Sequence, residues 1–162
     1  MQSLDGDGDG ETRARPTTAF FALDEDDTCI AQARHLAAEF LGRARTDQRV
    51  AVSARAVDLT RLVVSELVTN ARKYAPGPLW MELRIADGAV EVTVRDSGRA
   101  HPAARPGDPG RVGQHGLEIV MAVTESFDVR LEPSGKRVTA RIALADGTVG
   151  EVRRADVPPG PR

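Results

Sequence analysis

The sequence contains little of what would support a disulfide framework, a cysteine-rich metal site or an aromatic core. Cys29 is the only cysteine among 162 residues, so no disulfide can form within the chain. It stands at the start of a helical pattern, where we expect a small core residue rather than a nucleophile. Aromatic residues make up only 4% of the chain, and aliphatic side chains must therefore dominate the core.

The sequence also lacks a charge excess and a long apolar run. Lysine and arginine number 22 against 24 aspartate and glutamate, a formal net charge of -2, which argues against direct binding of nucleic acid. No apolar run is long enough to span a bilayer. Residues 1–16 are acidic and glycine-rich and do not resemble a secretion signal. We therefore expect a cytoplasmic protein without membrane contact.

The length is typical of one domain, which we expect to lie between two polar tails. Residues 1–16 and 146–162 contain too few apolar residues to offset the entropy of ordering, so we expect a disordered first tail and a flexible second one. The domain itself is expected over residues 17–145.

Hydrophobic spacing predicts strands and helices within this domain. Residues 18–23 form a short apolar run that is typical of a strand, and a helical period follows over residues 28–45. A second helical region is expected to begin near Asp47 and to end before Pro76, because proline disfavours helix in the residue that precedes it.

Two hairpins are predicted further along the chain. Alternating apolar residues flank Asp87-Gly88 over residues 79–96, and a last hairpin turns at Ser134-Gly135. We expect an α/β fold, namely a two-layer sandwich of a mixed, mostly antiparallel sheet with helices on one face.

The stretch "SELVTNARKYA", residues 65–75, carries one polar stripe along an apolar helix. Glu66, Asn70 and Lys73 share a helix face, because side chains three and four residues apart are neighbours. Such a stripe is commonly a solvated face, but the apolar surroundings favour one that lines a cleft. In a cleft, Glu66 could take a proton from a hydroxyl or water. The carboxamide oxygen of Asn70 could bind Mg²⁺.

The stretch "VTVRDSG" places a carboxylate at the end of a predicted strand. Strand alternation puts Asp96 on the side of the buried valines, where a carboxylate needs hydrogen-bond donors. Gly98 has no Cβ and would let a flat ligand approach the backbone. The same sequence is also typical of a plain turn, and the pattern alone leaves both interpretations open.

Residues 99–115 have no hydrophobic period and predict a long loop, which in compact domains is usually functional or disordered. Gly113 and Gly116 are expected to precede the next helix, whose free amides could bind phosphate. Arg111 and His115 could also reach phosphate oxygens, although charges in such a loop are more commonly solvated.

In this order, the three stretches resemble the GHKL ATPase superfamily, and most closely its anti-sigma-factor serine/threonine kinase branch. "SELVTNARKYA" is similar to the N box of that family, "DSG" to its first glycine box and "GQHGLEIV" to its second. The resemblance covers roughly residues 17–144. It implies the Bergerat ATP-binding fold, with ATP and Mg²⁺ as cofactors.

The resemblance also implies a role for each residue. Glu66 would be the general base, Asn70 the Mg²⁺ ligand, and Asp96 the acceptor for the exocyclic amine of adenine. Residues 99–115 would form a lid over the phosphates, and Arg137 occupies the place where a threonine often helps to hold adenine. The expected set of cofactor-binding residues is Asn70, Lys73, Asp96, Gly98, Arg111, Gly113, His115 and Gly116.

The function implied is that of an ATP-dependent anti-sigma factor and kinase. Such a protein binds a sigma factor, phosphorylates an antagonist protein on serine or threonine, and by analogy forms a homodimer. The alternative is a non-catalytic binding protein that senses nucleotide or acts without it. A histidine kinase is less favoured, because His35 lacks the acidic neighbour of the usual phosphoacceptor.

Overall fold

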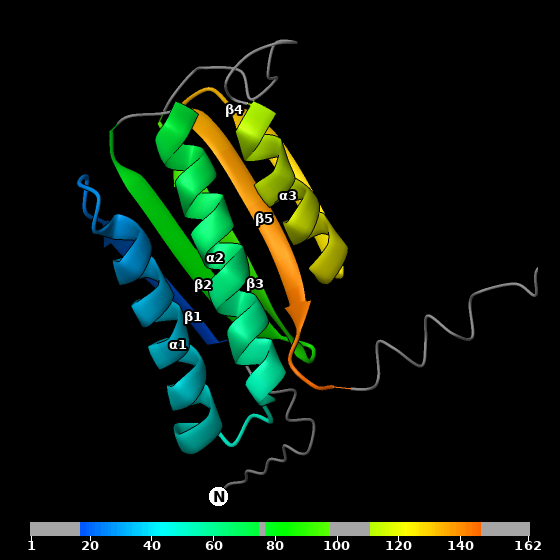
Figure 1. Ribbon diagram of the computed structural model, residues 1–162. Coiled ribbons are helices and arrows are strands. Elements are labelled where there is room, and N and C mark those ends of the chain that lie inside the picture. The colour runs from blue at the N-terminus through cyan, green and yellow to red at the C-terminus, as the bar shows by residue number, and fades with distance from the viewer. Residues whose placement is uncertain (1–16, 75–76, 98–110, 147–162) are drawn as a thin grey trace, which may run out of the picture.

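The structure, a computed structural model, describes residues 17–74, 77–97 and 111–146 (Figure 1). Of Tyr74 and residues 111–115 it describes the backbone only. Apart from Asp146, the tails expected over residues 1–16 and 146–162 lie outside the described residues.

The described residues form five strands and three helices. Their order along the chain is β1 (Thr17–Leu23), α1 (Cys29–Asp47), α2 (Ala54–Tyr74), β2 (Leu79–Ala86), β3 (Ala89–Asp96), α3 (Arg111–Val123), β4 (Ser126–Glu132) and β5 (Gly135–Ala143). The strands make one sheet in the order β1-β2-β3-β5-β4, in which every described pairing is antiparallel.

The three helices cover one face of this sheet, as Figure 1 shows. The expected two-layer α/β sandwich is therefore confirmed. α2 lies centrally and packs on α1, on α3 and on the middle strands β3 and β5. This central helix carries the polar stripe, so the fold itself places the stripe between two other helices.

The boundary between α1 and α2 differs from the prediction. α1 continues to Asp47, and α2 begins only at Ala54. Arg49 adopts a positive φ of 55°, and the backbone amide of Val50 donates to the carbonyl of Ala44 at 3.0 Å, so the chain leaves α1 here. The expectation that a helix begins near Asp47 is wrong, because this residue closes the preceding helix.

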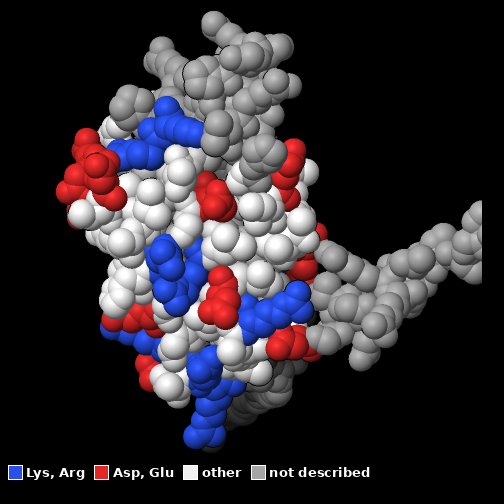
Figure 2. Space-filling model, viewed as in Figure 1, with Lys and Arg blue, Asp and Glu red and all other residues white. Residues whose placement is uncertain are grey.

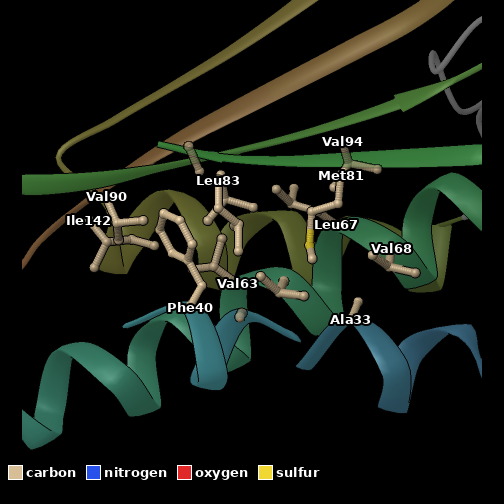
Figure 3. Close-up of a cluster of buried hydrophobic side chains, with 14 of the residues drawn as sticks. Ala33, Phe40, Val63, Leu67, Val68, Met81, Leu83, Val90, Val94 and Ile142 are labelled. Atoms are coloured by element: carbon tan, nitrogen blue, oxygen red, sulfur yellow. The ribbon is translucent and has the colours of Figure 1, made fainter. Parts of the chain in front are cut away.

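An aliphatic core joins the two layers, as the low aromatic content predicted. Val63, Leu67 and Val68 of α2 pack towards Met81 and Leu83 of β2 (Figure 3). Further buried side chains come from α1, β3 and β5, among them Cys29, Ala33, Ala37, Val90, Val92, Val94, Val138 and Ile142. Cys29 is fully buried and unpaired, which confirms it as a core residue.

Both outer surfaces of the sandwich carry charged side chains, and those of the helix-free side include the pairs Arg84–Glu91 and Arg141–Glu91. On the helix-bearing side, basic and acidic side chains alternate over the described residues (Figure 2). The opposite side of the sheet carries the exposed aromatic residues Phe20 and Trp80. Among the described residues, no helix combines the length and the apolar character that a membrane crossing requires.

Candidate functional site

Four elements that are distant in sequence come together at one end of the sandwich. The C-terminal end of α2, the first turns of α3, the end of β3 and the start of β5 lie at the same end in Figure 1. The antiparallel hairpins explain part of this arrangement, because β3 ends where β2 and β5 begin. Among the described residues, Glu66, Asn70 and Lys73 belong to α2, Asp96 ends β3, and Gly113 and Gly116 belong to α3.

Glu66 of α2 lies directly against Gly116 of α3. A methyl group added to Gly116 would stand 2.1 Å from Glu66 Oε1 and 3.2 Å from its Cδ. A Cβ cannot approach another atom that closely, so only glycine accommodates the Glu66 carboxylate in its present position. The N-box-like and second glycine-box-like stretches are therefore in contact, although fifty positions separate the two residues.

Asn70 and Lys73 follow Glu66 along α2 but differ in burial. Asn70 is buried at 7% exposure, whereas Lys73 lies exposed in the last turn of the helix. A buried carboxamide needs polar partners, so the position of Asn70 fits a polar pocket better than a solvated face. Lys73 stays a predicted cofactor-binding residue, and its exposed position does not test that role.

Asp96 ends β3 with its side chain on the helix-bearing side of the sheet, at 5% exposure. The inward orientation expected from strand alternation is confirmed. Gly135 of β5 packs on the backbone of this residue, since a Cβ there would stand 1.8 Å from the carbonyl oxygen of Asp96. Gly135 also has a positive φ of 149°, a conformation that L side chains rarely adopt. These two features fix the approach of β5 to the end of β3.

Lys136 is a buried residue beside Asp96 that the sequence did not indicate as a candidate site residue. It is the cross-strand partner of Asp96 and is only 3% exposed. Burial lowers the pKa of its ammonium group below the usual value, and the nearby Asp96 carboxylate opposes this change by raising it. A buried lysine of this kind is uncommon unless it is paired.

Arg137 does not occupy the place that the resemblance suggested. It pairs across strands with Arg95, on the helix-free side, and its Nε lies 3.8 Å from Glu132 Oε2. Neighbouring residues of a strand point to opposite faces of the sheet, so Arg137 faces away from the side on which Asp96 lies. The residue beside Asp96 is therefore Lys136.

The second glycine region also differs from the prediction. α3 begins at Arg111, so Gly113 and Gly116 lie within the helix and do not precede it. Residues 111–115, expected in the lid, have helical backbone, and the side chains of Arg111 and His115 lie outside the described residues. Gly98 and the remaining lid residues, 99–110, also lie outside them. Glycine was read as a sign of loop, but the spacing of the two glycines also suits a helix that packs closely on its neighbour.

Arg72, a residue without a predicted role, links the loops around this end of the molecule. Its Nη1 donates to the carbonyl of Gly77 at 3.1 Å, and its Nη2 donates to the carbonyls of Asp24 and Asp26, both at 3.3 Å. The last turn of α2 is thereby attached to the segment that joins β1 to α1. This attachment supports the part of α2 that carries Asn70 and Lys73.

A hollow of about 500 Å³ lies on the other side of the sheet. Outward-facing residues of β1, β2 and β3 form most of its wall, including Phe20, Trp80 and Arg95, and it reaches the end of β3 at Asp96 and Ser97. Glu66 and Asn70 do not line this hollow, so Asp96 is the described site residue through which it borders the site.

The fold and the site together define a class. A two-layer sandwich in which a helix with Glu66 and Asn70 covers the strand that ends in Asp96 is a nucleotide-binding arrangement of the Bergerat type. The sequence matches the profile of the histidine kinase-like ATPase domain over residues 23–142. The chain therefore belongs to the histidine kinase-like ATPase domain family.

Solved structures similar to this chain include three from histidine kinases. The blue-light activated histidine kinase of Erythrobacter litoralis EL346 has a TM-score of 0.48 and 23% identity over 60% of this chain, which spans 33% of that protein. The histidine kinase AdeS of Acinetobacter baumannii has a TM-score of 0.45 and 16% identity, and the match covers 79% of this chain and 68% of that one. The histidine kinase domain of the Erythrobacter protein has a TM-score of 0.44 and 20% identity, and the match covers 71% of this chain and 70% of that domain. No curated protein sequence is similar enough to the chain to count as a match.

Proposed function

We propose that this protein is an ATP-dependent anti-sigma factor that also acts as a serine/threonine kinase on an antagonist of the sigma–anti-sigma interaction. Family membership itself implies ATP binding, usually with Mg²⁺. The observation that carries the further step is the contact between Glu66 and Gly116. This contact holds the carboxylate of the N-box-like stretch beside the helix that the resemblance assigns to the phosphates.

The residues present fit a Mg²⁺ ion that is shared with the nucleotide. The described residues contain no group of three or more His, Cys, Asp or Glu that could hold a metal ion by themselves. Mg²⁺ in kinases is usually held by one or two protein oxygens together with substrate phosphates and waters. The buried carboxamide of Asn70 can provide such an oxygen. Bound there, the ion would neutralise phosphate charge.

The kinase step requires a base and correct placement of the two substrates. The carboxylate of Glu66 takes the proton from a serine or threonine hydroxyl of the antagonist. The hydroxyl oxygen then bonds to the γ-phosphorus of ATP, and the bond from that phosphorus to the bridging oxygen of ADP breaks. Asp96 holds the adenine by accepting a hydrogen bond from its amine. These groups lie on different elements, so the tertiary fold supplies the alignment.

The test is phosphoryl transfer from γ-labelled ATP to candidate antagonist proteins, measured together with calorimetric binding of Mg-ATP. Glu66→Gln should retain ATP binding and lose transfer, whereas Glu82→Gln, on the helix-free side of the sheet, should retain both. Transfer by Glu66→Gln at the wild-type rate would refute the role of Glu66. Wild-type protein that binds ATP and a sigma factor but transfers no phosphate would support the second candidate below.

A non-catalytic, nucleotide-sensing regulator is the second candidate. The observation that favours it is Lys136, a buried ammonium group opposite Asp96 on the adjacent strand. Its place concerns the expected base pocket and not Glu66. Calorimetry with ATP and ADP separates the candidates, because a sensor binds nucleotide without turnover.

We also propose that two copies of the chain pair through β1. β1 is an edge strand of 7 residues without charge or proline, whereas the other edge strand, β4, carries Asp128, Arg130 and Glu132. Charged side chains discourage edge-to-edge pairing, so of the two described edge strands β1 is better suited to pair with a second copy. Phe20 lies at its centre and is 71% exposed. Antiparallel pairing about Phe20 would bring two phenyl rings together and would oppose no like charges.

Light scattering tests this pairing. Phe20→Lys should convert a dimer into a monomer, and Leu131→Lys should leave the dimer intact, because Leu131 is 58% exposed on the opposite edge strand. A wild-type monomer at high micromolar concentration, or a dimer in Phe20→Lys, would refute the proposed interface. In either oligomeric state, we expect the protein to act in the cytoplasm, where sigma factors bind polymerase.

A further inference from the structure

The most unusual side chain at the site is the buried Lys136. It stands opposite Asp96 on the adjacent strand, and the next pair inward is Val94 with Val138. All four side chains face the helix layer and are buried. Side chains of directly opposite residues have Cβ atoms about 4.5–5.5 Å apart, so the ammonium and the carboxylate can act on neighbouring atoms of one ligand.

Burying this ammonium group carries a free-energy cost. Its lowered pKa reflects the loss of hydration, and the Asp96 carboxylate offsets only part of this effect. A pair of apolar residues usually stabilises a fold at least as well as a buried ion pair. A lysine kept here is therefore better explained by a ligand than by folding stability.

We propose that Lys136 and Asp96 together read the edge of the adenine base, with the Lys136 ammonium donating to ring N1 and Asp96 accepting from the exocyclic amine. This inference rests on the proposed binding of ATP at this site. Adenine presents a donor and an acceptor side by side on that edge, and the strand pair presents an acceptor and a donor in the same arrangement. Guanine reverses both, since it has a carbonyl oxygen at position 6 and an N–H at position 1. Lys136 is thus a specificity-determining residue for the adenine base.

The experiment compares Mg-ATP with Mg-1-deaza-ATP, in which a C–H group replaces N1 and the exocyclic amine is retained. A hydrogen bond from a charged donor is worth about 1.5–3 kcal/mol, which corresponds to a change in Kd of roughly 10- to 100-fold. We expect wild-type protein to bind the deaza analogue more weakly than ATP by a factor in this range. Lys136→Met, which keeps the buried aliphatic stem and removes the donor, should bind both nucleotides equally.

Arg137→Met is the matched control, because Arg137 is the next residue on the same strand and faces the opposite side of the sheet. It should discriminate between the two nucleotides as the wild type does. If Lys136→Met does not fold, the comparison within wild-type protein still decides the question. Equal binding of ATP and the deaza analogue by wild-type protein would overturn this inference and leave the proposed function standing. Failure of wild-type protein to bind ATP at all would overturn both.

Discussion

Substitution of Gly116 by alanine should separate stability from the proposed activity. The change adds one methyl group inside α3, at a point 2.1 Å from Glu66 Oε1. Alanine is favoured over glycine in a helix interior by about 0.8–1.0 kcal/mol. The carboxylate must turn away from the methyl group, and a side chain held off its staggered rotamer costs about 0.5–1.5 kcal/mol. The two terms nearly cancel, so the free energy of unfolding should change by less than about 1 kcal/mol.

The effect on catalysis should be much larger. General base catalysis contributes about 10²- to 10⁴-fold to a rate, and a displaced carboxylate loses part of that contribution. We expect phosphoryl transfer at saturating ATP to fall by roughly tenfold or more, while the variant keeps its fold. Transfer of labelled phosphate in a single turnover measures the rate, and urea denaturation measures stability.

Gly42→Ala is the matched control for this substitution. Gly42 lies inside α1, and a Cβ there would meet no atom within 4 Å. The control should gain the full helical stabilisation of about 1 kcal/mol, a rise in Tm of roughly 2–4 °C, with unchanged transfer. A Gly116→Ala protein that transfers phosphate as fast as Gly42→Ala would show that the position of the Glu66 carboxylate does not limit the reaction.

Three further outcomes are expected. Mg-ATP at about 100 times its Kd should stabilise the wild type by about 2.7 kcal/mol, which corresponds to a rise in Tm of roughly 5–10 °C. Asp96→Ala should lose this rise in Tm, and an equal rise in the variant would contradict the adenine contact. Gly135→Ala should destabilise the fold by more than the roughly 1–3 kcal/mol typical of strained backbone, because the added Cβ would also overlap the Asp96 carbonyl. Gly88 has a positive φ without such an overlap, so Gly88→Ala should lower the free energy of unfolding by less in the same urea titration. The pKa of Lys136 is lower in the folded than in the unfolded chain. Between the two pKa values the unfolded chain binds more protons, so the free energy of unfolding should rise as the pH increases through the folded pKa towards 10.5. Lys136→Met should lack that rise, and parallel pH profiles of the two proteins would contradict this assignment.

Much of the fold could be predicted because its signals are local. Strand alternation on either side of Asp87-Gly88 predicted the central hairpin and the inward orientation of Asp96, and both are confirmed. The spacing of Glu66 and Asn70 predicted one helix face in the same way. Local signals failed at the start of α3, where the glycines were taken for loop. Helix propensity disfavours glycine by only about 1 kcal/mol, and packing against α2 overrides a preference of that size.

The sequence by itself determined the alternation of strands and helices and the polar stripe of α2, because these depend on neighbours a few residues apart. Only the tertiary structure decided that Gly116 receives the Glu66 carboxylate and that Lys136, not Arg137, stands beside Asp96. Those contacts depend on the packing of α3 against α2 and on the register between β3 and β5. A shift of one residue in that register would exchange a buried ammonium for a half-buried guanidinium, and no pattern within either strand specifies it.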